Sequence, residues 1–301
     1  MFPKSATPDV PPRTTATAGG KSFGKLLAKS FQGFCASRDG YVPLLLAAWL
    51  APPAAALELK LSGFYDLNRP ASLDYDPDFC GLWIANEGPE VILVTLDGHE
   101  LRRFGTSLFR VKAITLEGDG VLVGDGYGNY QRLTRDGQPL GEPFAMGGTR
   151  MDTEGMAVDA DGTIIKVEDD PARIVWMTES GRVIREIDGH ALKPMLTEPQ
   201  GIARDPRTGH LLIVDDWEGT NSLFEFDADG RLLGTTPLIA YGRDPEGIAI
   251  RPGANQLFMA FDGGARIAAF DYTPTVAPGT EPPDPGADCA ISGLQTLPKP
   301  V

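Results

Sequence analysis

Acidic residues recur beside glycine at a constant spacing in the second half of the chain. Three segments resemble one another there, namely Asp152–Val158, Glu198–Arg204 and Asp244–Ile250. The third residues of these segments, Glu154, Gln200 and Glu246, follow one another at intervals of 46 residues, and each directly precedes a glycine. Carboxylate oxygens without histidine or cysteine beside them are ligands of hard cations. The pattern therefore favours calcium or magnesium over transition metals.

A second group of acids follows the short apolar runs that come after such segments. Because antiparallel neighbours run in opposite directions, one begins on the face where the other ends, and we expect both groups of acids on one face. Together with Glu154 and Glu246, the candidate metal ligands are Glu87, Asp125, Glu168, Asp169, Asp215, Asp216 and Asp262. Carboxylates gathered in this way repel one another, so some must bind a cation, pair with arginine or take up protons. The alternative for Glu154 and Glu246 is structural, with each accepting backbone N–H bonds from the neighbouring repeat.

Basic and aromatic residues near the same segments are candidates for ligand binding. Arg150 and Arg243 each come shortly before a segment that contains Glu-Gly, and Arg173 follows a cluster of acids. These arginines would hold a phosphate group or neutralise the nearby glutamates. Trp217 lies in a loop on the same predicted face, where it would form a ligand platform or pack against the next repeat. Gln200 is included because it replaces the glutamate of the other two segments.

Nucleophilic catalysis has no support in the sequence. There is no Gly-x-Ser-x-Gly elbow, no phosphate-binding loop and no dinucleotide fingerprint. The three histidines, His99, His190 and His210, fall in turns between predicted strands. That placement argues against a catalytic histidine and against zinc or haem sites.

The chain is organised as a repeat of four short strands. Each of the three clear copies contains a β-branched run, a third apolar run and Asp-Gly or similar turns, and two fainter copies precede them around Gly81–Ala85 and Gly120–Asp125. Four strands with a period of about 40 to 45 residues are typical of propeller blades. We therefore predict an all-β fold, a β-propeller of four-stranded blades over residues 57–272. Five repeats can be counted, which predicts five or six blades.

The two ends of this domain should meet. The fifth copy ends after its third strand, and the isolated run Leu57–Phe64 would supply the missing outer strand and close the ring. Residues 273–301 are rich in proline and are expected to form a tail over the surface. A bond between Cys80 and Cys289 would attach this tail to the first blade, and the sequence leaves open whether it forms. A closed ring has no edge that demands a partner, so we expect a monomer.

The first 56 residues are predicted to be a leader and a signal peptide. Lys21, Lys25, Lys29 and Arg38 precede the apolar run Val42–Ala51, and Ala54-Ala55-Ala56 provides a cleavage site. The run is too short for a good membrane span, although a non-cleaved anchor is the alternative. We therefore expect a periplasmic or secreted protein without a transmembrane span in its mature chain. Residues 57–301 carry 21 basic and 39 acidic side chains, a balance that disfavours nucleic acid as a partner.

On these motifs, the chain resembles the phytase-like esterase and SdiA-regulated group of bacterial exported propellers. The resemblance rests on Asp152–Ala157 and Asp244–Ala249, each followed by a polar turn and a strand that ends in acid. It implies a propeller, export from the cytoplasm, and binding of a divalent cation such as Ca²⁺ with phosphoesterase activity. The chain departs from the pattern at Gln200, and the first two repeats lack the Glu-Gly pair at the start of their first strand.

Two functions remain open at this point. The first is a metal-dependent hydrolase that acts on a small phosphate ester. The second is a non-catalytic binding propeller that holds a peptide, a glycan or an envelope protein and has at most structural calcium. Propellers host both classes, so the fold does not choose between them. Carboxylates that converge within metal–metal distance, about 3.5–4 Å for a two-ion site, would favour the hydrolase. Acids scattered singly around the rim would favour binding.

Overall fold

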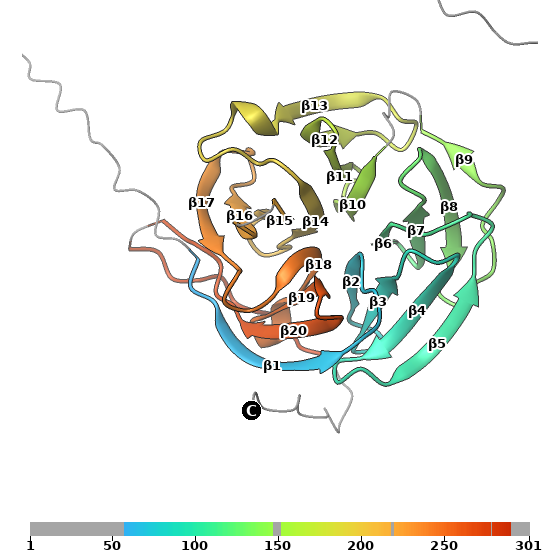
Figure 1. Cartoon of the computed structure of the whole chain (residues 1–301), viewed down its shortest axis with the longest axis horizontal. Helices are drawn as coiled ribbons and strands as arrows, with labels where there is room; N and C mark the ends of the chain where they lie inside the picture. Colours follow the sequence, from blue (N-terminus) through green and yellow to red (C-terminus); the bar gives the residue numbers. More distant parts are fainter. Residues whose placement is uncertain (1–56, 147–151, 218–219, 278, 290–301) are drawn as a thin grey trace, which may run out of the picture. The chain divides into compact units, whose positions relative to one another are not determined.

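The protein is described by a computed structural model, which covers residues 57–146, 152–217, 220–277 and 279–289. The predicted leader and signal peptide, together with Arg150, lie outside these described residues. Within them the chain forms five four-stranded antiparallel sheets arranged as a β-propeller (Figure 1). The predicted fold class is confirmed, with five blades.

Blades 1 and 2 are built from consecutive strands, with the first strand of each innermost (Figure 1). Blade 1 consists of β2 (Leu73–Asp76), β3 (Gly81–Ala85), β4 (Glu90–Thr95) and β5 (Glu100–Gly105). Blade 2 consists of β6 (Ala113–Glu117), β7 (Gly120–Gly124), β8 (Asn129–Thr134) and β9 (Phe144–Ala145).

Blades 3 and 4 follow the same order, and a short 3-10 helix, η1 (Gly189–Ala191), lies between them in the chain. Blade 3 consists of β10 (Thr153–Val158), β11 (Ile164–Asp169), β12 (Ala172–Met177) and β13 (Val183–Asp188). Blade 4 consists of β14 (Pro199–Arg204), β15 (Leu211–Asp215), β16 (Ser222–Phe226) and β17 (Leu232–Pro237).

Blade 5 joins the two ends of the propeller. Its inner strands are β18 (Arg243–Arg251), β19 (Gln256–Gly263) and β20 (Arg266–Asp271), with η2 (Pro252–Ala254) between the first two. Its outer strand is β1 (Lys60–Asp66), which pairs antiparallel with β20 from Lys60 opposite Asp271 to Asp66 opposite Arg266. The predicted closure of the ring by an N-terminal strand is confirmed.

The core lies between the blades, because each sheet has two faces to bury. Leu82 and Ile84 of β3 pack towards blade 5, whereas Trp83 and Ala85 of the same strand pack towards blade 2. Alternation along a strand therefore serves two interfaces at once. Five clusters of buried apolar side chains result, and each spans two adjacent blades.

Glycine allows the innermost strands of blades 3, 4, 5 and 1 to approach closely at the axis. A Cβ atom on Gly155 would lie 2.5 Å from the carbonyl oxygen of Gln200, and one on Gly201 would lie 2.7 Å from that of Glu246. A Cβ on Gly247 would lie 2.3 Å from the carbonyl oxygen of Ala71. The glycine of each Glu-Gly or Gln-Gly pair is thus required by contact between neighbouring blades.

The C-terminal segment is anchored at two points. Cys289 forms a disulfide with Cys80, and the carboxylate of Asp288 receives hydrogen bonds of 2.9 and 2.5 Å from the guanidinium group of Arg251. The described part of this segment contains no helix or strand. No helix among the described residues is both long and apolar enough to cross a membrane.

Candidate functional site

Three residues from each blade surround the end of the propeller axis where the innermost strands begin. The strand pairing defines equivalent positions, because Ala113, Gly155 and Gly247 of the innermost strands pair with Gly124, Val167 and Ala260 of the second strands. We call these innermost-strand residues and their equivalents, Ser72 and Gly201, the glycine position. The residue just before the glycine position is named axial, and the residue two before the axial one is named rim. The residue two after the second-strand partner of the glycine position is named strand-end. The rim residues are Arg69, Arg110, Asp152, Glu198 and Asp244. The axial residues are Ala71, Lys112, Glu154, Gln200 and Glu246, and the strand-end residues are Glu87, Gly126, Asp169, Asp216 and Asp262. We call the whole group the acidic mouth.

β-bulges place the axial residues of blades 3, 4 and 5. In each of these blades the pairing register shifts at the axial residue, between Thr153 and Gly155, between Pro199 and Ile202, and between Pro245 and Gly247. A bulge leaves one residue out of the ladder and redirects its side chain.

Four of the eight described non-glycine residues with a positive φ angle belong to the acidic mouth. Positive φ angles occur at Arg69 (50°), Glu87 (59°), Asp152 (97°) and Asp244 (53°). Three of these four are rim residues of different blades. Backbone strain in residues other than glycine is characteristic of binding and catalytic sites, because only a functional or over-determined position retains it.

Alternation along the second strand divides the predicted acids into two sets. Asp125 accepts hydrogen bonds from the backbone N–H groups of Tyr127 and Asn129, and Asp215 accepts them from Thr197, Glu198 and Trp217. These two carboxylates order the loops of their blades. The next position along the second strand of each blade is the strand-end position. It is occupied by Asp169 in blade 3 and by Asp216 in blade 4, and both belong to the mouth.

Glu168 is likewise occupied by a structural network. It is fully buried and forms ion pairs with Lys166 at 2.6 Å and with Arg173. Arg173 also pairs with Glu186 at 3.0 Å. Burial lowers the pKa of Lys166, while the Glu168 carboxylate opposes that shift. Arg173, predicted to bind a ligand, is thus committed to two protein carboxylates.

Lys112 is the central basic residue of the mouth, and sequence reasoning missed it. Its ammonium nitrogen lies 2.7 Å from Glu154 Oε2, 3.2 Å from Glu246 Oε2 and 3.4 Å from Glu87 Oε1. It therefore connects carboxylates from blades 1, 3 and 5. Aligning Lys112-Ala113 with Glu154-Gly155 would have revealed it, but the two pairs share no residue type.

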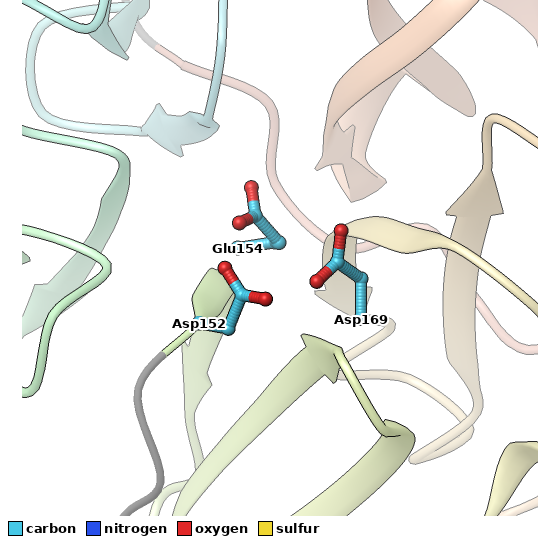
Figure 2. A group of neighbouring side chains, drawn as sticks. All are labelled: Asp152, Glu154 and Asp169. Atoms are coloured by element: carbon cyan, nitrogen blue, oxygen red, sulfur yellow. The ribbon is translucent and has the colours of Figure 1, made fainter. Parts of the chain in front are cut away.

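Three carboxylates of blade 3 converge beside Lys112. One oxygen each from Asp152, Glu154 and Asp169 can be chosen so that all lie within 4.8 Å of one another, and Figure 2 shows the three side chains gathered together. Asp169 Oδ1 is buried and receives no hydrogen bond from an N–H or hydroxyl group of the described residues. Burial raises the pKa of Asp169 to about 7, with a further contribution from the adjacent Asp152 carboxylate. Without a cation, the raised pKa thus favours a proton on this pair below about pH 7.

Blade 4 repeats this arrangement with different residues. Burial raises the pKa of Asp216 to about 8, and its rim neighbour Glu198 adds to the shift, as do Glu246 and Asp244. Burial also raises the pKa of Glu246, although Lys112 opposes the change. Two adjacent blades thus each present a rim acid and a strand-end acid as a pair.

Blade 1 contributes an ion pair and a small cavity. Arg69 Nη2 lies 2.5 Å from Glu87 Oε2. Burial raises the pKa of Glu87, but Lys112 and Arg69 outweigh it and leave that pKa below its ordinary value. A cavity of about 20 Å³ lies between Arg69, Glu87, Glu246 and Asp262, which is room for one water molecule.

The remaining ligand-binding candidates differ in their placement. Gln200 is buried at its axial position, and its Oε1 has no hydrogen-bond partner among the described residues. Trp217 is 45% exposed, directly after the strand-end Asp216. Arg243 is exposed at the start of β18, one residue before the rim Asp244.

Comparison with known proteins shows similarity at the level of fold. No family model matches the chain, and no curated protein matches it. A glutaminyl cyclase from Myxococcus xanthus is similar with a TM-score of 0.56 and 11% identity, covering 73% of this chain and 99% of that chain. A β-propeller domain of Cps50 (Swd1) from Myceliophteria thermophila gives a TM-score of 0.46 and 9% identity, covering 72% of this chain and 100% of that domain. The chain is thus a five-bladed β-propeller whose likeness to solved structures concerns the fold alone.

Proposed function

We propose that this chain is an exported propeller of the phytase-like, SdiA-regulated type that hydrolyses a small phosphate ester with the help of a divalent cation. The ion would be of the calcium or magnesium class and would be held by Asp152, Glu154 and Asp169. The convergence of these three carboxylates on blade 3 carries the proposal. Acids scattered singly around the rim would have favoured a different function.

The chemistry of the three residues fits such an ion. All three offer carboxylate oxygens, which hard divalent cations prefer. Asp169 Oδ1 is buried without a hydrogen-bond donor among the described residues, as expected of an oxygen that is kept for a ligand. A cation would also replace the proton that Asp152 and Asp169 otherwise share.

The rest of the mouth supplies complementary groups for ester hydrolysis. A bound divalent cation would screen the phosphate charge and lower the pKa of a water molecule. Burial raises the pKa of Asp216 to about 8, which suits this carboxyl to donate a proton to a leaving alkoxide. Lys112 is placed to stabilise negative charge next to Glu154.

Thermal unfolding with and without calcium tests the cation site. Ligand present at about 100 times its Kd adds about 2.7 kcal/mol to the free energy of unfolding, so the melting temperature should rise with calcium concentration. Asp152→Asn and Asp169→Asn should abolish this rise. Asp229→Asn removes an exposed carboxylate in the turn between β16 and β17 and should leave the rise unchanged.

Hydrolysis is tested separately with p-nitrophenyl phosphate and calcium. Turnover by the wild type that is lost in Asp169→Asn and retained in Asp229→Asn supports the proposal. If calcium shifts the melting temperature but no phosphate ester is hydrolysed, the cation is structural. If neither effect occurs, the proposed function is wrong.

Two observations favour non-catalytic binding as a second candidate. Lys112 already neutralises glutamates of three blades, so the mouth is balanced in part without an ion. Three exposed aromatic side chains also lie in loops, each directly next to a mouth residue in the sequence. Phe109 is 88% exposed, Tyr127 is 54% exposed and Trp217 is 45% exposed. Such side chains suit an extracytoplasmic protein or glycan partner. An absence of turnover together with loss of partner binding in Trp217→Ala would favour this function.

A further inference from the structure

Blade 2 differs from the other four blades at the acidic mouth. Its rim, axial and strand-end residues are Arg110, Lys112 and Gly126, so it offers no carboxylate at any of the three positions. Every other blade places at least one acid there. The mouth therefore has a basic sector on blade 2, directly beside the carboxylates of blade 3.

Arg110 retains donors that the protein does not use. Its Nε donates to the carbonyl oxygen of Asp125 at 2.9 Å, and its guanidinium group stacks on the ring of Tyr127 with a distance of 4.5 Å to the ring centroid. No carboxylate of the described residues lies within ion-pair distance of Arg110. Its rim counterpart in blade 1, Arg69, is by contrast paired with Glu87. Two contacts thus fix the plane of the Arg110 guanidinium, while its two terminal nitrogens have no acceptor among the described residues.

Gly126 provides the space that this guanidinium occupies. A Cβ atom at Gly126 would lie 2.8 Å from Arg110 Nη2. The other four blades carry Glu or Asp at this strand-end position. The missing side chain therefore both makes room for Arg110 and removes the carboxylate that would have neutralised it.

The basic sector adjoins the proposed cation site. The backbone N–H of Asp152 donates to the carbonyl oxygen of Gly126 at 2.5 Å, which joins the two blades at this point. Lys112, the second basic residue of blade 2, contacts Glu154 of the same cluster. A ligand bound between blades 2 and 3 would meet a guanidinium group on one side and three carboxylates on the other.

We infer that Arg110 is the main anion-binding residue of the mouth and that it holds the phosphoryl oxygens of the ligand. A planar guanidinium with two free nitrogens matches two oxygens of a phosphoryl group, and stacking on Tyr127 orders it in advance. This inference rests on the proposed function for the phosphoryl identity of the anion. Arg110 was not among the residues that the sequence suggested, and it is free of the two carboxylate partners that occupy Arg173.

Isothermal titration of the full chain with inorganic phosphate, with and without calcium, tests the inference. Arg110→Gln should weaken phosphate binding by about tenfold or more, since hydrogen bonds to charged groups contribute about 1.5–3 kcal/mol. Arg110→Lys keeps the charge but loses the paired donors, so its affinity for phosphate should lie between that of the wild type and that of Arg110→Gln. Arg182→Gln, an exposed arginine in the turn between β12 and β13, should bind phosphate as the wild type does.

The calcium-induced rise in melting temperature separates this inference from the proposed function. Retention of the rise in Arg110→Gln together with weakened phosphate binding supports both. Weakened phosphate binding in a protein that shows no calcium effect supports the role of Arg110 and contradicts the cation site. Phosphate affinity unchanged in both Arg110 variants, or no phosphate binding by the wild type under either condition, would overturn the inference.

Discussion

The ammonium nitrogen of Lys112 lies 2.7 Å from Glu154 Oε2, although the two residues occupy equivalent positions in adjacent blades. A basic residue in blade 2 thus contacts its acidic counterpart in the neighbouring blade 3. The same ammonium group reaches Glu246 at 3.2 Å. This arrangement means that the charge of one axial residue controls how strongly the mouth attracts a cation.

Replacing Lys112 by methionine should strengthen calcium binding. The change removes a positive charge beside Glu154, so the negative potential of the mouth increases and the calcium-induced rise in melting temperature should be larger than in the wild type. Without calcium the variant should lose about 1–3 kcal/mol of stability, because buried carboxylates lose their partner. Lys193→Met, at an exposed position, provides the control. A calcium response that is equal in both variants would show that the ion binds elsewhere.

The stability of the metal-free protein should decrease as the pH rises. The pKa of Asp169 is raised to about 7 and that of Asp216 to about 8, so both carboxyls keep a proton in the folded state when the unfolded chain has already lost it. Their contribution to stability is complete below pH 4 and is lost as the pH rises through 7 to 8. Melting temperatures in EDTA between pH 5 and pH 9 measure this slope.

The same slope should be reduced in Asp169→Asn and in Asp216→Asn, because an amide does not titrate. Calcium should reverse the trend in the wild type, since a cation competes with protons for the same oxygens. A slope that is identical in the wild type and in both variants would assign the pH dependence to other groups.

The adjacent acids Glu168 and Asp169 should respond in opposite ways to loss of charge. Glu168→Gln leaves the ammonium of Lys166 buried beside a neutral amide and should cost about 3–5 kcal/mol, measured by urea unfolding. Asp169→Asn removes repulsion from Asp152 and should preserve or increase stability in EDTA while abolishing the calcium response. Equal destabilisation by both substitutions would contradict the division between structural and mouth acids.

An acid placed at the strand-end position of blade 2 should abolish anion binding by Arg110. Gly126 has a φ of 78°, a conformation that both aspartate and asparagine tolerate better than most residues. Gly126→Asp and Gly126→Asn are nearly identical in shape, so each displaces the end of the Arg110 side chain to a similar extent. Only the aspartate neutralises it, and phosphate titration should show the weaker affinity in that variant.

Much of the architecture could be predicted from the sequence because its signals are local. Turn residues, β-branched runs and the spacing of Glu154, Gln200 and Glu246 specify four-stranded repeats without any knowledge of contacts. The site was harder to predict, since Glu168 and Asp169 look alike as neighbouring acids. Only the pairing register shows that one is buried against Lys166 and the other belongs to the mouth.

The basic residues were missed for a related reason. Arg110 occupies a position that blades 3 to 5 fill with acids, and Lys112 one that they fill with Glu or Gln, so similarity of residue type does not reveal either. Gly126 gave no signal either, because its importance lies in the absence of a carboxylate. Equivalence by strand pairing, rather than by residue type, reveals all three.

The pairing of β1 with β20 imposes an order of assembly on the chain. Blades 1 to 4 are each continuous in sequence and can form as they emerge, N-terminal blade first. Blade 5 must wait, because its outer strand is made at the start of the domain and the other three at the end. Until β18 to β20 arrive, β1 remains an unpaired strand and blades 1 and 4 each expose a face that blade 5 will cover. The interval before ring closure is therefore the period in which this protein is most exposed to misassociation and proteolysis.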